Sequence, residues 1–131
     1  MKRSMIAAAL ALAVFSAMPA EARPRHHHRN HHRHVAAGQP AECAGIAWCG
    51  CWLRLKLGIR DPRLNLARAW VRVGTAASGP GAGVIAVWRH HVGIITADLG
   101  GGQIMLLSGN DGHAVRERPR PTRGIIAYRR V

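Results

Sequence analysis

The chain has 131 residues and a formal net charge of +13, from 19 lysines and arginines against six aspartates and glutamates. This length excludes a large multidomain protein, and the positive charge favours a polyanionic partner such as a cell-wall polymer, an anionic lipid surface or a nucleic acid. The arginines are scattered and no nucleic-acid-binding motif accompanies them, so we expect no nucleic-acid partner.

The first 22 residues have the three parts of a secretory signal peptide. Residues 1–3 carry positive charge, an alanine-rich apolar run of about 14 residues covers 5–18, and Ala-Glu-Ala at 20–22 has the form of a cleavage site. Because the run is short for a bilayer span, we expect export to the periplasm or the exterior, with no stable membrane span after cleavage. Retention as an uncleaved anchor is the alternative.

Residues 23–40 form a segment rich in histidine and arginine that lacks the apolar side chains of a core, so we expect a disordered linker. This segment also suggests an alternative function, in which the exported protein binds metal through these histidines and the Cys49-x-Cys51 pair. The candidate ligands of that alternative are His26, His27, His28, His31, His32 and His34. Otherwise we expect neither a metal nor another cofactor.

Residues 41–131 are enough for one small domain, with thirteen lysines and arginines against five acidic residues. Its first predicted element is a short apolar helix from Trp48 to Leu57, with Cys49 at its start and Gly58 as its stop. A cysteine at a helix N-terminus lies at the positive end of the backbone dipole, which favours the thiolate. An inert, buried core cysteine is the alternative.

The pairing of the three cysteines is open. Outside the cytoplasm thiols tend to be oxidised in pairs, and an odd count leaves one over. A Cys43–Cys51 bridge with Cys49 free fits this arithmetic, and three free thiols are an equal alternative. Cys49 and Cys51 are separated by about 200° around a helix, so they cannot both face one cleft.

A second helical pattern covers residues 64–73 and ends at Gly74. Its apolar stripe consists of Leu66, Ala69, Trp70 and Val73. Four short runs of apolar and β-branched residues then predict strands at 84–88, 91–96, 103–107 and 125–128, with an exposed arginine- and proline-rich loop at 116–123. Helices followed by adjacent strands predict an α+β fold, with the N-terminal helices packed on one face of a small antiparallel sheet.

Three histidines of this domain, His90, His91 and His113, are candidate bases for a cysteine nucleophile. Such a nucleophile needs a histidine within hydrogen-bond distance and gains from a polar group that orients the ring. Strand alternation places His91 and Gly93 on one face and His90 on the other, and we expect Gly93 to leave open space for a substrate beside His91. Asn110 follows the next strand, where its amide would contact the His91 ring.

The order of these motifs resembles the small NlpC/P60- and CHAP-like cysteine peptidases. Trp48-Cys49, the run at 83–88, His91-Val92-Gly93 and Gly109-Asn110 follow one another as in a short bacterial subgroup, over residues 43–131. The resemblance implies a reduced papain-like α+β core, with Cys49 as nucleophile, His91 as general base and Asn110 as the orienting residue. The neighbouring Trp48 and Trp88 are the candidate substrate-binding side chains.

The resemblance also implies an activity, the hydrolysis of amide bonds in peptidoglycan by an endopeptidase or amidase without a cofactor. An exported, basic domain suits that anionic, extracytoplasmic substrate. A catalytically silent cell-wall-binding module on the same fold is the alternative.

Overall fold

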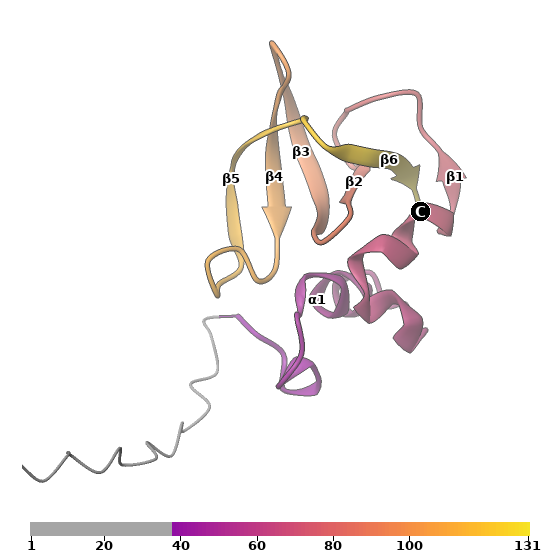
Figure 1. The fold of residues 1–131 in the computed structure, drawn as a ribbon, viewed down its shortest axis with the longest axis vertical. Coiled ribbons are helices and arrows are strands. Elements are labelled where there is room, and N and C mark those ends of the chain that lie inside the picture. Colours follow the sequence, from indigo (N-terminus) through magenta and orange to yellow (C-terminus); the bar gives the residue numbers. More distant parts are fainter. Residues whose placement is uncertain (1–37) are drawn as a thin grey trace, which may run out of the picture. The chain divides into compact units, whose positions relative to one another are not determined.

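The structure is a computed structural model that describes residues 38–131 (Figure 1). The predicted signal peptide at 1–22 and all but the last three residues of the predicted linker at 23–40 lie outside the described residues. The six candidate histidine ligands lie there as well. No helix of residues 38–131 is long and apolar enough to cross a membrane.

The helix that begins at Cys49 is confirmed as α1, Cys49–Lys56. Gly58 ends it as predicted, with a positive φ of 69° that side chains other than glycine rarely adopt. The amides of Gly58 and Ile59 donate to the carbonyls of Leu55 and Arg54, which satisfies two carbonyls of the last turn. A short 3-10 helix, η1 (Ala41–Cys43), precedes α1.

The predicted α-helix at 64–73 is wrong in type, because two 3-10 helices cover this segment. They are η2 (Pro62–Asn65) and η3 (Ala67–Arg72). A 3-10 helix has three residues per turn, so side chains three positions apart share one side. The buried stripe is therefore Leu64, Ala67 and Trp70, whereas Leu66 is 66% exposed.

All six strands of the described chain pair antiparallel in one sheet, in the order β1-β6-β2-β3-β4-β5 (Figure 1). Their bounds are Thr75–Ala76 (β1), Ile85–Trp88 (β2), Val92–Gly100 (β3), Gln103–Ser108 (β4), Arg116–Pro121 (β5) and Ile125–Arg130 (β6). The four predicted strands correspond to β2, β3, β4 and β6. The α+β class with an antiparallel sheet is therefore confirmed.

The predicted loop at 116–123 is wrong over Arg116–Pro121, which form the edge strand β5 beside β4. An edge strand tolerates proline because only one of its sides is hydrogen-bonded. Arg118 lies opposite Leu106 in β4, and Arg120 lies opposite Ile104. The pairing therefore fixes two arginines against the face of the sheet on which these two residues are buried.

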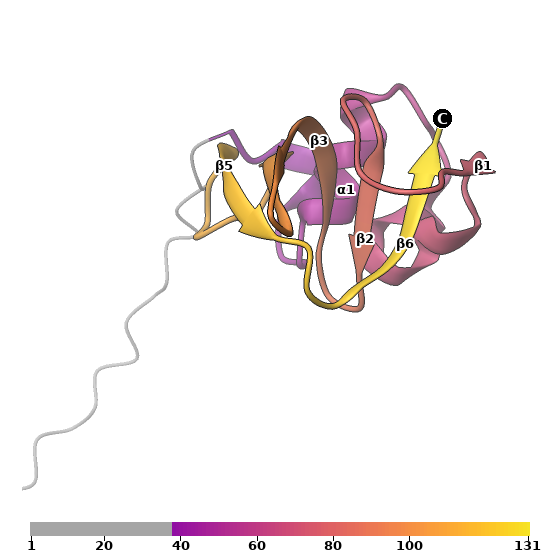
Figure 2. The same cartoon turned by 90° about the horizontal axis from the view of Figure 1, so that it is seen from above.

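The sheet separates two groups of buried side chains, and α1 covers only one of its faces (Figure 2). On the α1 face the strands contribute Ile85, Val87 and Val92. On the other face they contribute Ala86, Ile95, Ile104 and Leu106, together with Val84 just before β2. This alternation along β2 and β3 is the period of two that the sequence pattern predicts.

Gly50 of α1 packs so closely on η2 that a Cβ there would lie 2.4 Å from the Leu64 carbonyl oxygen. Alanine normally stabilises a helix by about 1 kcal/mol relative to glycine. Here overlap with rigid backbone reverses that preference, so Gly50→Ala should lower the free energy of unfolding by about 1–3 kcal/mol. Urea unfolding followed by circular dichroism measures the change.

Gly79→Ala is the control, because nothing lies within 4 Å of a Cβ at that position. It should leave the stability nearly unchanged. A Gly50→Ala protein as stable as the parent would contradict the close packing of α1 on η2.

Candidate active site

Cys49 is the one free thiol among residues 38–131, because Cys43 and Cys51 form a disulfide. The bridge joins η1 to the first turn of α1, with Cα atoms 5.8 Å apart. Of the two pairings left open by the sequence, the structure has the one that leaves Cys49 free. The Cys51 sulfur is therefore not available as the thiolate ligand that the metal-binding alternative requires.

The Cys49 sulfur lies against the turn between β2 and β3, 4.0 Å from the carbonyl oxygen of His90. The backbone N–H groups of Cys49, Gly50 and Val92 also interact with it. The Cys49 residue is only 3% exposed, yet it lines a cavity of about 480 Å³. The other lining residues precede α1, lie between η2 and η3 or at their ends, or belong to the β2–β3 turn: Ile46, Ala47, Asn65, Leu66, Ala67, Arg68, Arg89 and His90. Cys49 thus borders the cavity although nearly all of its surface is buried.

Burial raises the pKa of the Cys49 thiol above its ordinary value. The three backbone N–H groups and the positive charge of Arg120 oppose this effect but do not outweigh it. The expectation that the helix start makes Cys49 a thiolate is therefore wrong in its net direction. In the resting protein this thiol is protonated at neutral pH.

The His91 ring points to the side of the sheet that α1 does not cover. Its Nε2 atom lies 2.9 Å from the hydroxyl oxygen of Ser108 at the end of β4, and its ring centroid lies 6.2 Å from that of Trp88. Burial, followed by the charge of Arg120, lowers the pKa of His91 to about 4. The imidazole is therefore neutral at pH 7.

The predicted open space beside Gly93 is wrong. A Cβ on Gly93 would lie 2.8 Å from the Cβ of Ser108 and 3.0 Å from Cδ1 of Leu106. The glycine instead permits β4 to approach β3 closely, which brings the Ser108 hydroxyl to the His91 ring.

Asn110 lies in the corner after β4, in the left-handed region with φ of 55°. Within residues 38–131 no hydrogen bond joins Asn110 to the His91 ring, and Ser108 is the polar group that contacts the imidazole. Sequence reasoning missed Ser108, although a serine at the end of a strand that precedes Gly109-Asn110 is a signal for it.

The two candidate substrate-binding tryptophans differ in exposure. Trp48 is 3% exposed, and a Cβ on Gly109 would lie 2.9 Å from its ring, so Trp48 packs in the core. Trp88 is half-buried, and its Nε1 donates to the carbonyl of Arg123 at 2.9 Å. Of the two, only Trp88 offers a substantial part of its ring to solvent.

An ion cluster around a buried carboxylate acts on the His91 ring. The carboxylate of Asp111, which is 2% exposed, pairs with the guanidinium groups of Arg118 and Arg120 from β5. The Arg118 guanidinium holds the pKa of Asp111 below its ordinary range, so the carboxylate is charged. The Arg120 guanidinium also lies over the Trp88 ring, 5.9 Å from its centroid.

Arg120 connects the candidate nucleophile with the candidate base, because its charge lowers the pKa of both the Cys49 thiol and the His91 imidazole. The sulfur interacts with His90 and Val92, the residues on either side of His91. Within the described residues no hydrogen bond joins the sulfur to the His91 ring. The resting arrangement is therefore a neutral thiol beside the backbone that carries a neutral imidazole.

Residues 38–131 contain no group of three histidine, cysteine, aspartate or glutamate side chains that could hold a metal ion. Comparison with known proteins gives no match to a family model, to a curated protein or to a solved structure. The resemblance to NlpC/P60- and CHAP-like peptidases accordingly rests on the order of the motifs in the sequence.

Replacing Arg120 by glutamine should raise the pKa of both the Cys49 thiol and the His91 imidazole, because the guanidinium lowers both. The pH dependence of iodoacetamide alkylation measures the first value, and an NMR titration measures the second. Arg118→Gln is the matched control, since Arg118 also pairs with Asp111 but acts on His91 without acting on the thiol. An unchanged thiol pKa in Arg120→Gln would contradict this electrostatic connection.

Proposed function

We propose that the chain is an exported cysteine hydrolase that cleaves amide bonds in peptidoglycan, as a stem-peptide endopeptidase or an amidase. One observation carries the proposal: Cys49, the free cysteine at the start of α1, lines a cavity, and its sulfur contacts the turn that contains His90 and His91. A helix that carries a cysteine and packs on an antiparallel sheet is also what a reduced papain-like core requires.

The reaction in this proposal starts from the neutral pair. The mechanism requires the His91 ring to leave Ser108, on the face of the sheet away from α1, and to reach the sulfur. The ring then accepts the thiol proton as the sulfur attacks the amide carbonyl. The backbone N–H of Cys49 is the donor for the developing oxyanion, since amides at a helix start lack partners within the helix. The imidazolium then gives its proton to the leaving amine, and a thioester remains.

Water completes the cycle. Neutral His91 takes a proton from the water that attacks the thioester, and returns it to the sulfur as the carboxylic acid leaves. A histidine with a pKa of about 4 is a weak base, but its protonated form is a strong acid toward the leaving amine.

Cys49→Ala should abolish the release of fragments from purified peptidoglycan, measured by mass spectrometry, because no other free thiol lines the cavity. His91→Ala should lower the rate by about 10²–10⁴-fold, the usual contribution of a general base. His90→Ala is the matched control, since this exposed neighbour lines the cavity but is not the proposed base. Loss of activity in His90→Ala alone would transfer the role to His90, and full activity of Cys49→Ala would disprove the hydrolase.

The pH profile provides a second test. Because His91 must be neutral to accept the thiol proton, kcat/KM should fall on the acid side near pH 4, following the pKa of His91. Circular dichroism at each pH is the control, because the unfolded chain binds this proton first and stability decreases as the pH falls from about 6.5 to 4. An acid limb near 6.5 in the folded protein would contradict the assignment of His91.

A catalytically silent wall-binding module is the second candidate. The burial of Cys49 and the hydrogen bond between His91 and Ser108 favour this module, because both features keep the thiol and the imidazole apart in the resting protein. Sedimentation of the protein with purified peptidoglycan, without release of fragments at any pH, would support this module.

A further inference from the structure

A second cavity, of about 660 Å³, is lined by residues of η2, η3 and β6. Its lining combines aliphatic side chains, among them Leu66 and Ile126, with the guanidinium groups of Arg63, Arg68 and Arg72. Neither Cys49 nor His91 lines it. A cavity of this size that combines apolar and charged groups has the character of a ligand site, and the proposed hydrolase chemistry does not use it.

Two aliphatic side chains of this second cavity stand largely in solvent. Leu66 is 66% exposed and Ile126 is 55% exposed. The pairing of β6 with β2 skips Ile126, because Val87 lies opposite Ala127 and Trp88 lies opposite Ile125. A β-bulge of this kind re-aims the side chain of the unpaired residue, and Ile126 lines the cavity beside η3. Exposed apolar residues that share one hollow indicate an interaction site, whereas single ones do not.

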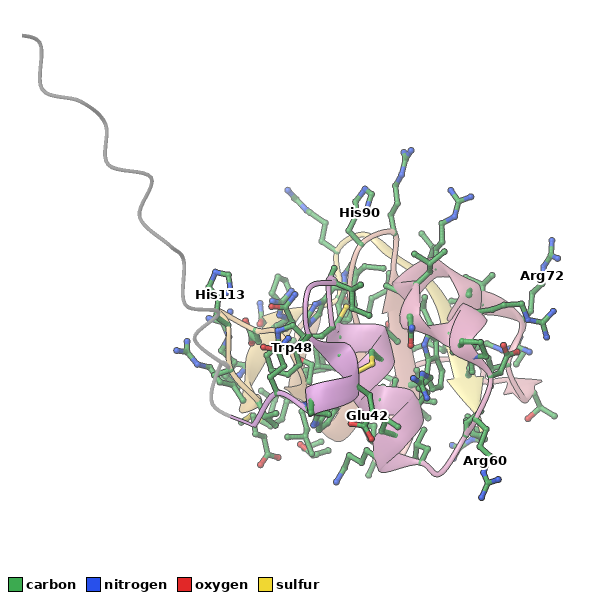
Figure 3. All side chains as sticks on the ribbon, turned by 90° about the horizontal axis from the view of Figure 1, so that it is seen from below. Glu42, Trp48, Arg60, Arg72, His90 and His113 are labelled. Atoms are coloured by element: carbon green, nitrogen blue, oxygen red, sulfur yellow. A yellow bond between two sulfur atoms is a disulfide. The ribbon has the colours of Figure 1, made fainter. Side chains whose placement is uncertain are left out.

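The charge of this second cavity is positive and is only partly neutralised. Asp61, the one acidic residue among the described residues that line it, pairs with Arg63 at 2.7 Å. Arg68 and Arg72 are exposed and take part in none of the salt bridges of residues 38–131. Figure 3 shows Arg72 extending away from the ribbon. The charge complement of this cavity is therefore an anionic occupant.

The chain itself does not supply such an occupant. In a two-fold pair of copies joined through this cavity, Arg68 and Arg72 would approach the same arginines of the second copy. Residues 23–40 carry four arginines and no acidic residue, so they would add further positive charge. The occupant is therefore another molecule, which is anionic and has an apolar part.

We propose that this second cavity docks the protein on the surface of an anionic lipid bilayer. The phosphate of a lipid head group contacts Arg68 and Arg72, and the boundary of the acyl chains contacts Leu66 and Ile126. A bilayer surface presents phosphate and hydrocarbon next to each other, which matches arginines that flank aliphatic side chains. A nucleic acid would use the arginines and leave Leu66 and Ile126 in water. The inference does not depend on the hydrolase function.

The test measures cosedimentation of the chain from residue 23 onward with vesicles of phosphatidylcholine and phosphatidylglycerol. Arg72→Gln should lower the partition coefficient about fivefold, the usual contribution of one arginine near an anionic surface. Ile126→Ser should lower it by a similar factor, because an aliphatic contact with the acyl boundary is lost. Both residues line the second cavity and not the cavity at Cys49. The arginines of residues 23–40 are common to all variants, so their attraction to the vesicles cancels in the ratio.

Arg116→Gln in β5 and Leu99→Ser in β3 are the matched controls, because they make the same kinds of change at exposed residues outside this cavity. Both should leave the partition coefficient nearly unchanged. Ile126→Leu should retain the binding of the parent, since it keeps the aliphatic contact. Where circular dichroism shows that Ile126→Ser has lost its fold, Leu66→Ser makes the same change on the η2–η3 side of the cavity.

Equal losses in Arg72→Gln and Arg116→Gln would overturn the proposal, because they would show that the whole basic chain is attracted and not this cavity. Vesicle binding that is insensitive to both serine variants would overturn it too, since the acyl boundary would then have no role. Arg72-dependent binding of single-stranded DNA without binding of the vesicles would identify a polyanion site and would likewise overturn it.

Discussion

The Cys43–Cys51 disulfide determines which thiol of the chain is available for chemistry. It joins Cys51 in the first turn of α1 to Cys43 in η1 and so removes both sulfurs from the free thiols. Cys49 lies about 200° around the helix from Cys51, and this rotation directs its sulfur to the carbonyl of His90. The close packing of Gly50 on η2 also restricts how α1 can rotate about its axis.

Burial has opposite effects on the two candidate reacting groups. Desolvation disfavours charge, so it raises the pKa of the Cys49 thiol and lowers the pKa of the His91 imidazole. The positive charge of Arg120 lowers both values and therefore cannot bring them together. Only direct contact between thiolate and imidazolium stabilises both charges at once, and in the resting structure the His91 ring is instead bonded to Ser108. In the proposed mechanism, transfer of the thiol proton therefore requires the His91 ring to leave Ser108.

Features set by neighbouring residues could be predicted from the sequence, and features set by strand pairing could not. The start of α1 at Cys49 and its end at Gly58 depend on local backbone preferences. β5 was missed because arginine and proline disfavour strands, and only its pairing with β4 stabilises it. The same pairing places Arg120 near His91, and the close packing of β3 on β4 selects Ser108 as the partner of the ring. The sequence therefore predicts the position of the free thiol but not the polar surroundings of the histidine.

The positive charge of the domain is divided between two environments. On one side of the sheet, the buried carboxylate of Asp111 holds Arg118 and Arg120, so those charges contribute to the packing of β5 and to the electrostatics around His91. Away from that cluster, on η3, Arg68 and Arg72 have no acidic partner among residues 38–131 and are exposed to solvent. Exposed charges of this kind contribute little to folding. The charges of Arg68 and Arg72 therefore leave the fold largely unaffected, whereas those of Arg118 and Arg120 stabilise β5 around the carboxylate of Asp111.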